Sequence, residues 1–228
     1  MTSREHVLAA LDVVIDPELD EPITSLRFVS SVEITSEGDV DVLLRLPTPQ
    51  CAPNFAFLMA ADAGAAVRRL PGVRTVTVKL QGHYTGDEIN GALARGDGFT
   101  GAFPGETEDD DLSALRELFQ RKALIARQSR LCEALLHAGM EPEQIVGLWV
   151  ANLEDGPELR RCLELREQLG IAAEAGAPAF VSPNGEPLAA EDLQRWLRMA
   201  RLVRTSLETN GGICRSLLQF RHDLVSDP

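Results

Sequence analysis

Two alternating apolar runs separated by a short polar turn constrain the fold of this 228-residue chain more than any other feature. Residues 28–34 and 40–46 have the period-two pattern of β-strands. Ser36-Glu37-Gly38-Asp39, which lies between them, has the composition of a turn. The pattern therefore predicts an antiparallel hairpin.

A helix pattern lies on each side of this hairpin. Ser3 is a hydroxyl cap, followed by apolar residues at helical spacing until Asp16-Pro17 ends the pattern. A second helix is expected at 53–70, and residues 73–80 have the pattern of a third strand. The expected order of elements over residues 1–85 is α-β-β-α-β, which predicts a small α+β domain.

The rest of the chain lacks strand patterns of comparable strength. Residues 86–108 have no sustained period and are expected to form a linker or an ordered lid. Residues 109–228 are expected to form an all-α domain, in which two separate helices at 189–207 and 213–225 come last. The predicted fold class is α+β, with the small domain followed by a helical module.

Charge and composition exclude several classes of function. The formal charge of −13 argues against binding to DNA or RNA, whose phosphates repel an acidic surface. No stretch approaches the ~20 apolar residues of a membrane helix, and no secretory signal pattern is recognised. The four cysteines are scattered without a CxxC pair, so we expect reduced thiols. These features predict a cytoplasmic protein that acts on neither nucleic acid nor membrane.

Cys51 is the best candidate for chemistry. It lies in the segment Pro47-Thr48-Pro49-Gln50-Cys51-Ala52-Pro53-Asn54, between the second strand and the second helix. Backbone N–H groups at a helix N-terminus favour negative charge, so a thiol there is biased toward the thiolate. A lone cysteine after a strand is, without further information, more often a small buried hydrophobe.

Three segments resemble the MIP18-like family, also called the DUF59 or SufT/PaaD-type domain, of iron-sulfur cluster assembly proteins. They are Val14-Ile15-Asp16-Pro17-Glu18 with the apolar residues after it, Leu46-Pro47-Thr48-Pro49-Gln50-Cys51, and Leu70-Pro71-Gly72-Val73. Matched residue by residue, Asp16 and Glu18 correspond to the family's acidic loop, Thr48 to its threonine and Cys51 to its reactive cysteine. The chain departs from the family at Arg27, because members usually have glycine at this backbone position.

The resemblance implies a nonenzymatic maturation factor that delivers or inserts an iron-sulfur cluster or iron into a client metalloenzyme. The segment around Cys51 and the helical extension are similar to accessory proteins of multicomponent iron oxygenases. We expect Cys51, Thr48, Asp16 and Glu18 to bind the cluster, and Cys51, Asp16 and His83 to ligate metal. One thiolate cannot complete a four-cysteine site, so binding is expected to be transient, with ligands shared across a homodimer or with the client.

Plainer interpretations stand beside each of these assignments. Asp16 and Glu18 also suit a turn that ends a helix, and His83 also suits an exposed loop. Cys132 with His137, and Cys214 with His222, are expected to serve core packing. For the whole chain, a metal-independent interaction scaffold or client-specific folding chaperone is the main alternative. An enzyme with Cys51 as nucleophile is a weaker one, because no general base is evident.

Cationic residues recur every three positions in one helical pattern near the end of this acidic chain. They are Arg195, Arg198, Arg201 and Arg204. Such a series suits a solvated face with intrahelical ion pairs. The alternative hypothesis is a docking surface for an acidic client protein.

Overall fold

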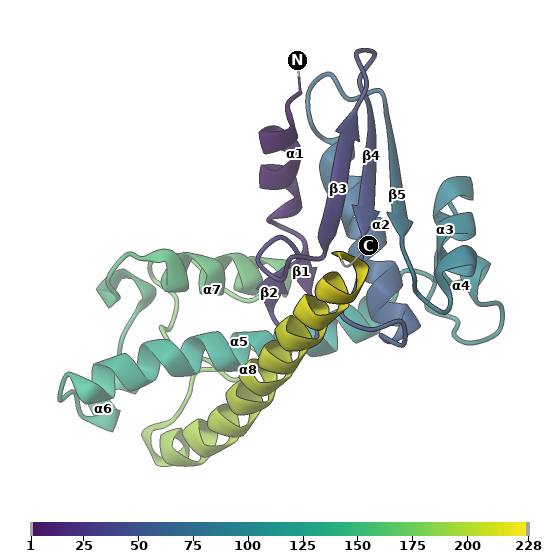
Figure 1. Ribbon diagram of the computed structural model, residues 1–228. Coiled ribbons are helices and arrows are strands. Elements are labelled where there is room, and N and C mark those ends of the chain that lie inside the picture. Colours follow the sequence, from purple (N-terminus) through teal and green to yellow (C-terminus); the bar gives the residue numbers. More distant parts are fainter. Residues whose placement is uncertain (1, 227–228) are drawn as a thin grey trace. The chain divides into compact units, whose positions relative to one another are not determined.

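The computed structural model describes residues 2–226, with side chains described as far as Arg221. Two compact units are present (Figure 1). The sheet unit comprises Met1–Ala114 and Glu208–Pro228, and the helical unit comprises Leu115–Leu207. The expected mixed α+β class is confirmed. No helix among the described residues has the length and apolar character needed to cross a membrane.

The sheet unit begins with a short helix and a short two-stranded ribbon. Its elements in chain order are α1 (Arg4–Leu11), β1 (Ile15–Asp16), β2 (Glu21–Pro22), β3 (Val29–Ile34), β4 (Asp39–Leu44), α2 (Pro53–Arg68), β5 (Thr75–Leu80), α3 (Gly86–Arg95) and α4 (Phe99–Ala102). The Ser3 side chain accepts a hydrogen bond from the backbone N–H of His6, as expected for an N-cap. The helix ends at Leu11 rather than near Asp16, because Ile15 and Asp16 pair with Pro22 and Glu21 in the antiparallel ribbon β1–β2.

The main sheet has the order β3-β4-β5, and the predicted hairpin is confirmed. Strands β3 and β4 are antiparallel, and Gly38 in their turn has a φ of 90°, which favours glycine. Strand β5 runs parallel to β4, so the chain crosses from one to the other through α2. Helix α2 lies behind the sheet in Figure 1 and packs against β5. Val40, Val42 and Leu44, at alternate positions of β4, are buried.

Residues 86–108 contain the helices α3 and α4. Helix α3 packs against β5, and its Ile89 and Ala92 are fully buried. Phe99 of α4 contacts Phe57 of α2 edge to face, with ring centroids 5.5 Å apart. This segment is therefore part of the apolar core of the sheet unit. The domain boundaries expected from the sequence stay predictions.

Arg27 has a φ of 60°, which places a non-glycine residue in the left-handed region. This is a conformation that glycine, the usual residue at this position in the resembled family, adopts without strain. A left-handed conformation costs roughly 1–2 kcal/mol for a residue with a Cβ atom. Asp20 and Leu112 are the other non-glycine residues with positive φ in the described chain, and all three belong to the sheet unit.

The helical unit is built around a buried arginine. Its elements are α5 (Ser113–His137, which starts in the sheet unit), α6 (Pro142–Val146), η1 (Val150–Asn152), α7 (Pro157–Gln168) and the first part of α8 (Ala190–Ser226). Arg166 is fully buried, and its Nη atoms donate hydrogen bonds to Gln128 Oε1 at 2.7 Å and to the Pro178 and Ala179 carbonyls at 2.9 and 2.5 Å. These bonds tie helix α7 to α5 and to the segment before α8.

Helix α8 is continuous, whereas the sequence predicts two helices with a break after Leu207. Gly211 and Gly212 stay helical, although glycine in a helix interior costs about 1 kcal/mol. A Cβ atom at Gly211 would lie 3.0 Å from Glu21 Oε1, so a larger residue there would require the Glu21 side chain to shift slightly. The second part of α8, from Glu208, therefore belongs to the sheet unit. The side chain of His222 lies outside the described residues.

Candidate functional site

Cys51 lies on the loop that joins β4 to α2. Pro53 takes the first position of α2, where proline is favoured. The buried residues of α2 begin at Ala56. Ala52 is the N-cap residue and provides no side-chain hydrogen bond, while Asn54 Oδ1 accepts one from the backbone N–H of Phe55 in the first turn, at 2.9 Å. Cys51 thus immediately precedes the N-terminus of α2. The Cys51 side chain is half-buried, and Thr48 Oγ1 lies 3.6 Å from its Sγ. A hydroxyl at this distance can stabilise a thiolate by donating a hydrogen bond to sulfur.

His83 contacts the backbone of Cys51 rather than its thiol. His83 Nε2 lies 2.8 Å from the Cys51 carbonyl oxygen. The backbone N–H of Thr85 donates to His83 Nδ1, so the proton on the imidazole belongs on Nε2, which then donates to the carbonyl. This pairing positions the loop that carries Cys51. The expected role of His83 as a metal ligand stays a prediction.

Asp16 is a buried carboxyl group in the turn of the β1–β2 ribbon. Its Oδ1 accepts hydrogen bonds from the backbone N–H groups of Glu18 at 2.8 Å and Leu19 at 3.0 Å. Burial raises its pKa from 3.8 to about 6, although the two backbone hydrogen bonds act in the opposite direction. The carboxyl group therefore takes up or releases a proton close to neutral pH. The Glu18 side chain is exposed.

The second part of α8 packs over the loops that surround Cys51. Arg215 Nη1 pairs with both carboxylate oxygens of Glu21, at 2.8 and 2.6 Å. Arg221 donates to the carbonyl of Leu46, which precedes the Cys51 loop, at 2.6 Å. It also donates to the carbonyl of Gly82, which precedes His83, at 2.7 Å. One helix thus holds the acidic ribbon and both loops.

Cys214 is a second thiol at this site, and sequence reasoning missed it. Burial, together with negative charge on Asp16, Cys51 and Glu18, raises the pKa of the half-buried Cys214 thiol to about 11. Its neighbour Arg215 pairs with Glu21 of the acidic ribbon, so Cys214 lies on the part of α8 that packs on the sheet unit. No local signal could have found it, because Arg221 on the same helix reaches a carbonyl 175 positions earlier in the chain.

The donor set is one that iron accepts, although it is sparse. Thiolate sulfur and carboxylate oxygen are both iron ligands, and Cys51 and Asp16 are side chains of these two kinds. Within the described residues, no group of three or more histidine, cysteine, aspartate or glutamate side chains is arranged to hold a metal ion. The other two cysteines, Cys132 and Cys162, are buried in the apolar cores of the helical unit, as expected for Cys132.

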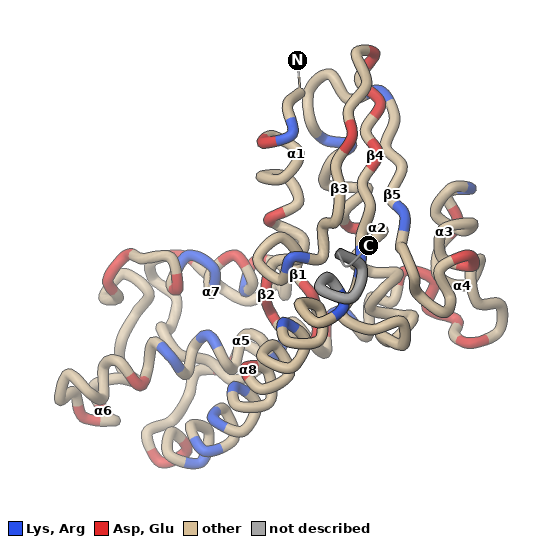
Figure 2. The backbone as a smooth tube through the Cα atoms, viewed as in Figure 1, with Lys and Arg blue, Asp and Glu red and all other residues tan. Residues whose placement is uncertain are grey.

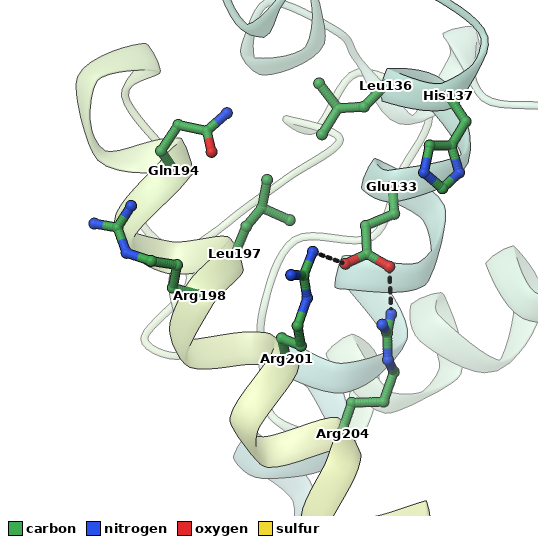
Figure 3. Close-up of a pocket in the computed structure, with 8 residues that line it drawn as sticks. All are labelled: Glu133, Leu136, His137, Gln194, Leu197, Arg198, Arg201 and Arg204. Carbon is green, nitrogen blue, oxygen red and sulfur yellow. Dashed lines mark hydrogen bonds and ion pairs between the residues drawn. The ribbon is translucent and has the colours of Figure 1, made fainter.

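The four arginines of the cationic series all lie in the helical unit, and they have different partners. Arg195 pairs with Asp192 three residues earlier, as an intrahelical ion pair. Arg201 and Arg204 both reach Glu133 of α5, at 3.5 and 2.6 Å (Figure 3). Arg198 lines the same pocket as these two arginines. The structure therefore assembles three of the four around one cavity and leaves Arg195 outside it.

Comparison with known proteins places these features in a family. Residues 4–80 match the model of a family described as iron-sulfur cluster assembly protein. An uncharacterized protein of Methanocaldococcus jannaschii is 37% identical over 93 residues, which is 41% of this chain and 96% of that protein. The match to the family includes Asp16, Thr48 and Cys51, and it ends before α3.

Proposed function

We propose that this chain, which belongs to the family of iron-sulfur cluster assembly proteins, carries iron or an iron-sulfur cluster to a client metalloenzyme. The observation that carries the proposal is the placement of Cys51. Its side chain is half-buried, has the Thr48 hydroxyl 3.6 Å from the sulfur and precedes the N-terminus of α2. A thiol in this environment is suited to bind iron reversibly, because the thiolate is the form that ligates metal.

The cargo is held by few ligands from this chain. Cys51 provides the thiolate and Asp16 a carboxylate, and within the described residues no group of three or more such side chains is arranged to complete a site. A stable cluster usually has four cysteine ligands, so the remaining positions are filled by the client or by a second copy in a homodimer. A carrier with incomplete ligation releases its cargo readily, which suits transfer.

The proposal extends to the compartment in which the protein acts and to the client that it serves. All four cysteines are unpaired, which supports a role in the reducing cytoplasm. An oxygenase component with an iron centre is the client that the Thr48-Pro49-Gln50-Cys51-Ala52-Pro53-Asn54 segment favours, through its resemblance to accessory proteins of such enzymes. The helical unit would then recognise that client.

The test is anaerobic loading of the full chain with ferrous iron and sulfide, followed by gel filtration and assay of retained iron and sulfide. Wild type should retain both and pass them to an apo-ferredoxin acceptor. Cys51→Ala should retain little of either. Cys162→Ala is the matched control, because it also removes one thiol but from the core of the helical unit. Equal retention by wild type and Cys51→Ala would favour the metal-independent scaffold instead.

A further inference from the structure

A pocket between α5 and α8 of the helical unit has a cavity volume of about 450 Å³. This volume lies within the range of typical ligand sites. Polar and charged groups line most of it, including His137, Gln194, Arg198 and Arg201. Leu136 and Leu197 face each other across the apolar part (Figure 3).

The pocket is positively charged in an otherwise acidic chain. Three guanidinium groups, of Arg198, Arg201 and Arg204, stand against the single carboxylate of Glu133, which leaves a net charge of +2. The hydrogen bond from Arg204 and the charges of Arg204 and Arg201 lower the pKa of Glu133, so this carboxylate stays ionised. Figure 2 shows the same series of cationic residues along α8. The chain as a whole carries a formal charge of −13.

Part of this positive charge is available for a ligand. Among the described residues, none forms an ion pair or hydrogen bond with the exposed guanidinium of Arg198. The Arg201 contact with Glu133 is an ion pair at 3.5 Å, and Glu133 Oε1 has no hydrogen-bond donor. Arg204, in contrast, is held at 2.6 Å and is half-buried. Arg204 therefore fixes Glu133, while Arg198 and Arg201 are positioned to bind a further anion.

We infer that this pocket binds carboxylate side chains from an acidic segment of a partner protein. Arginine forms charge-assisted hydrogen bonds with carboxylates, and two arginines on successive turns of one helix suit a segment with two acidic side chains. Leu136 and Leu197 provide contact for the aliphatic part of those side chains. That the partner is the client metalloenzyme rests on the proposed function. The binding of carboxylate side chains in the pocket does not.

If the ligand binds in the pocket, Arg198 and Arg195 should contribute differently to its affinity, although both are exposed arginines on the same helix. Arg198 lines the cavity, whereas Arg195 lies outside it and pairs with Asp192. A diffuse electrostatic attraction would depend equally on both residues. Binding in the pocket depends on Arg198 alone of the two. Arg195→Glu is therefore a matched control with the same change in charge.

The experiment measures fluorescence anisotropy of a short labelled peptide of alternating glutamate and glycine, titrated with the full-length protein. A peptide with glutamine in place of glutamate keeps the size and removes the charge. Wild type should bind the glutamate peptide and not the glutamine peptide. Arg198→Glu should weaken binding about tenfold, which corresponds to one lost charge-assisted hydrogen bond. Arg195→Glu should change it less than about twofold, and Cys51→Ala should leave it unchanged.

Three results would overturn the inference. They are absence of binding by wild type, equal binding of the two peptides, and equal loss in Arg195→Glu and Arg198→Glu. A homodimer that the glutamate peptide dissociates would identify the occupant as a second copy of this chain and would overturn the assignment to a partner protein. Because Cys51 takes no part in this binding, failure here leaves the proposed function standing, and failure of iron loading leaves the pocket standing.

Discussion

The sheet unit and the helical unit each bury an ionisable side chain, and the two groups behave differently. Arg166 in the helical unit donates hydrogen bonds to two backbone carbonyls and to Gln128, and arginine stays charged in proteins. Asp16 in the sheet unit accepts two backbone hydrogen bonds, and burial raises its pKa to about 6. The first group is a permanent structural tie, whereas the second changes charge near neutral pH, beside the Cys51 site.

Backbone strain follows the same division. Asp20 and Arg27 have positive φ and lie in the sheet unit, near the acidic ribbon. Strained residues persist where surrounding structure holds them, and they cluster at functional sites. The comparison teaches that the helical unit buries a charge fixed by hydrogen bonds, whereas the sheet unit buries a group that titrates and also holds strained backbone. Four substitutions test that contrast, in order of decreasing effect.

Arg166→Met should lower the free energy of unfolding of the helical unit by about 3 kcal/mol, because buried acceptors on Gln128 and Ala179 lose their donors. The two tryptophans, Trp149 and Trp196, both lie in the helical unit, so tryptophan fluorescence in urea reports on it. Arg160→Met is the control, since Arg160 is exposed and pairs only with Asp155. Equal midpoints for the two variants would remove Arg166 from its structural role.

Asp16→Asn should remove the change in the free energy of unfolding of the sheet unit that wild type shows between about pH 3.8 and pH 6. Because burial raises the Asp16 pKa from 3.8 to about 6, the folded unit binds more protons than the unfolded chain between these values. The stability from this group is fully present below pH 3.8 and is lost as pH rises through about 6, by up to about 3 kcal/mol. The asparagine Oδ1 can still accept both backbone hydrogen bonds.

Hydrogen exchange of peptides from residues 12–28, measured in wild type and Asp16→Asn across this pH range, checks the prediction. Protection in wild type should fall relative to Asp16→Asn as pH rises, after correction for intrinsic exchange. A constant difference between the two proteins would show that Asp16 does not titrate in this window.

Arg221→Ala should increase the alkylation rate of Cys51 about fivefold. The substitution removes hydrogen bonds to the carbonyls of Leu46 and Gly82, and two net hydrogen bonds of this kind are worth about 1–2 kcal/mol. Local opening of the Cys51 loop then becomes more frequent. Gln219→Ala, on the same helix and exposed, should leave the rate unchanged. Equal rates in both variants would show that α8 does not restrain the loop.

Arg27→Gly should raise the free energy of unfolding of the sheet unit by about 0.5–1 kcal/mol. Glycine removes the cost of positive φ at this position, and part of the gain is offset by the greater freedom of glycine in the unfolded chain. Thermal unfolding followed by circular dichroism measures the change. A decrease in stability would mean that contacts of the arginine side chain outweigh the backbone strain.

Local signals made much of the fold predictable. The β3–β4 hairpin, the Ser3 cap and the boundaries of α2 each depend on residues a few positions apart. Where the apolar pattern and the local backbone preference agree, the sequence alone predicts the element.

Interactions between distant residues account for what was missed. The β1–β2 ribbon replaces the end of the expected first helix, because pairing of Asp16 with Glu21 outweighs the helical pattern. Two helices were expected at 189–207 and 213–225, yet α8 is continuous, and its second part pairs with Glu21 and the Leu46 carbonyl of the sheet unit. The placement of Cys214 depends on this continuation. The site residues predicted from the family stay predictions until cargo binding is measured.

The most direct test of the central claim, that the Cys51 thiol holds the cargo, is alkylation before and after anaerobic loading with ferrous iron and sulfide. Mass spectrometry then gives the extent of modification at each cysteine. The account predicts that loading protects Cys51, while the core thiol of Cys162 stays unreactive in both states because it is buried. Equal modification of Cys51 in the loaded and unloaded protein would contradict the account.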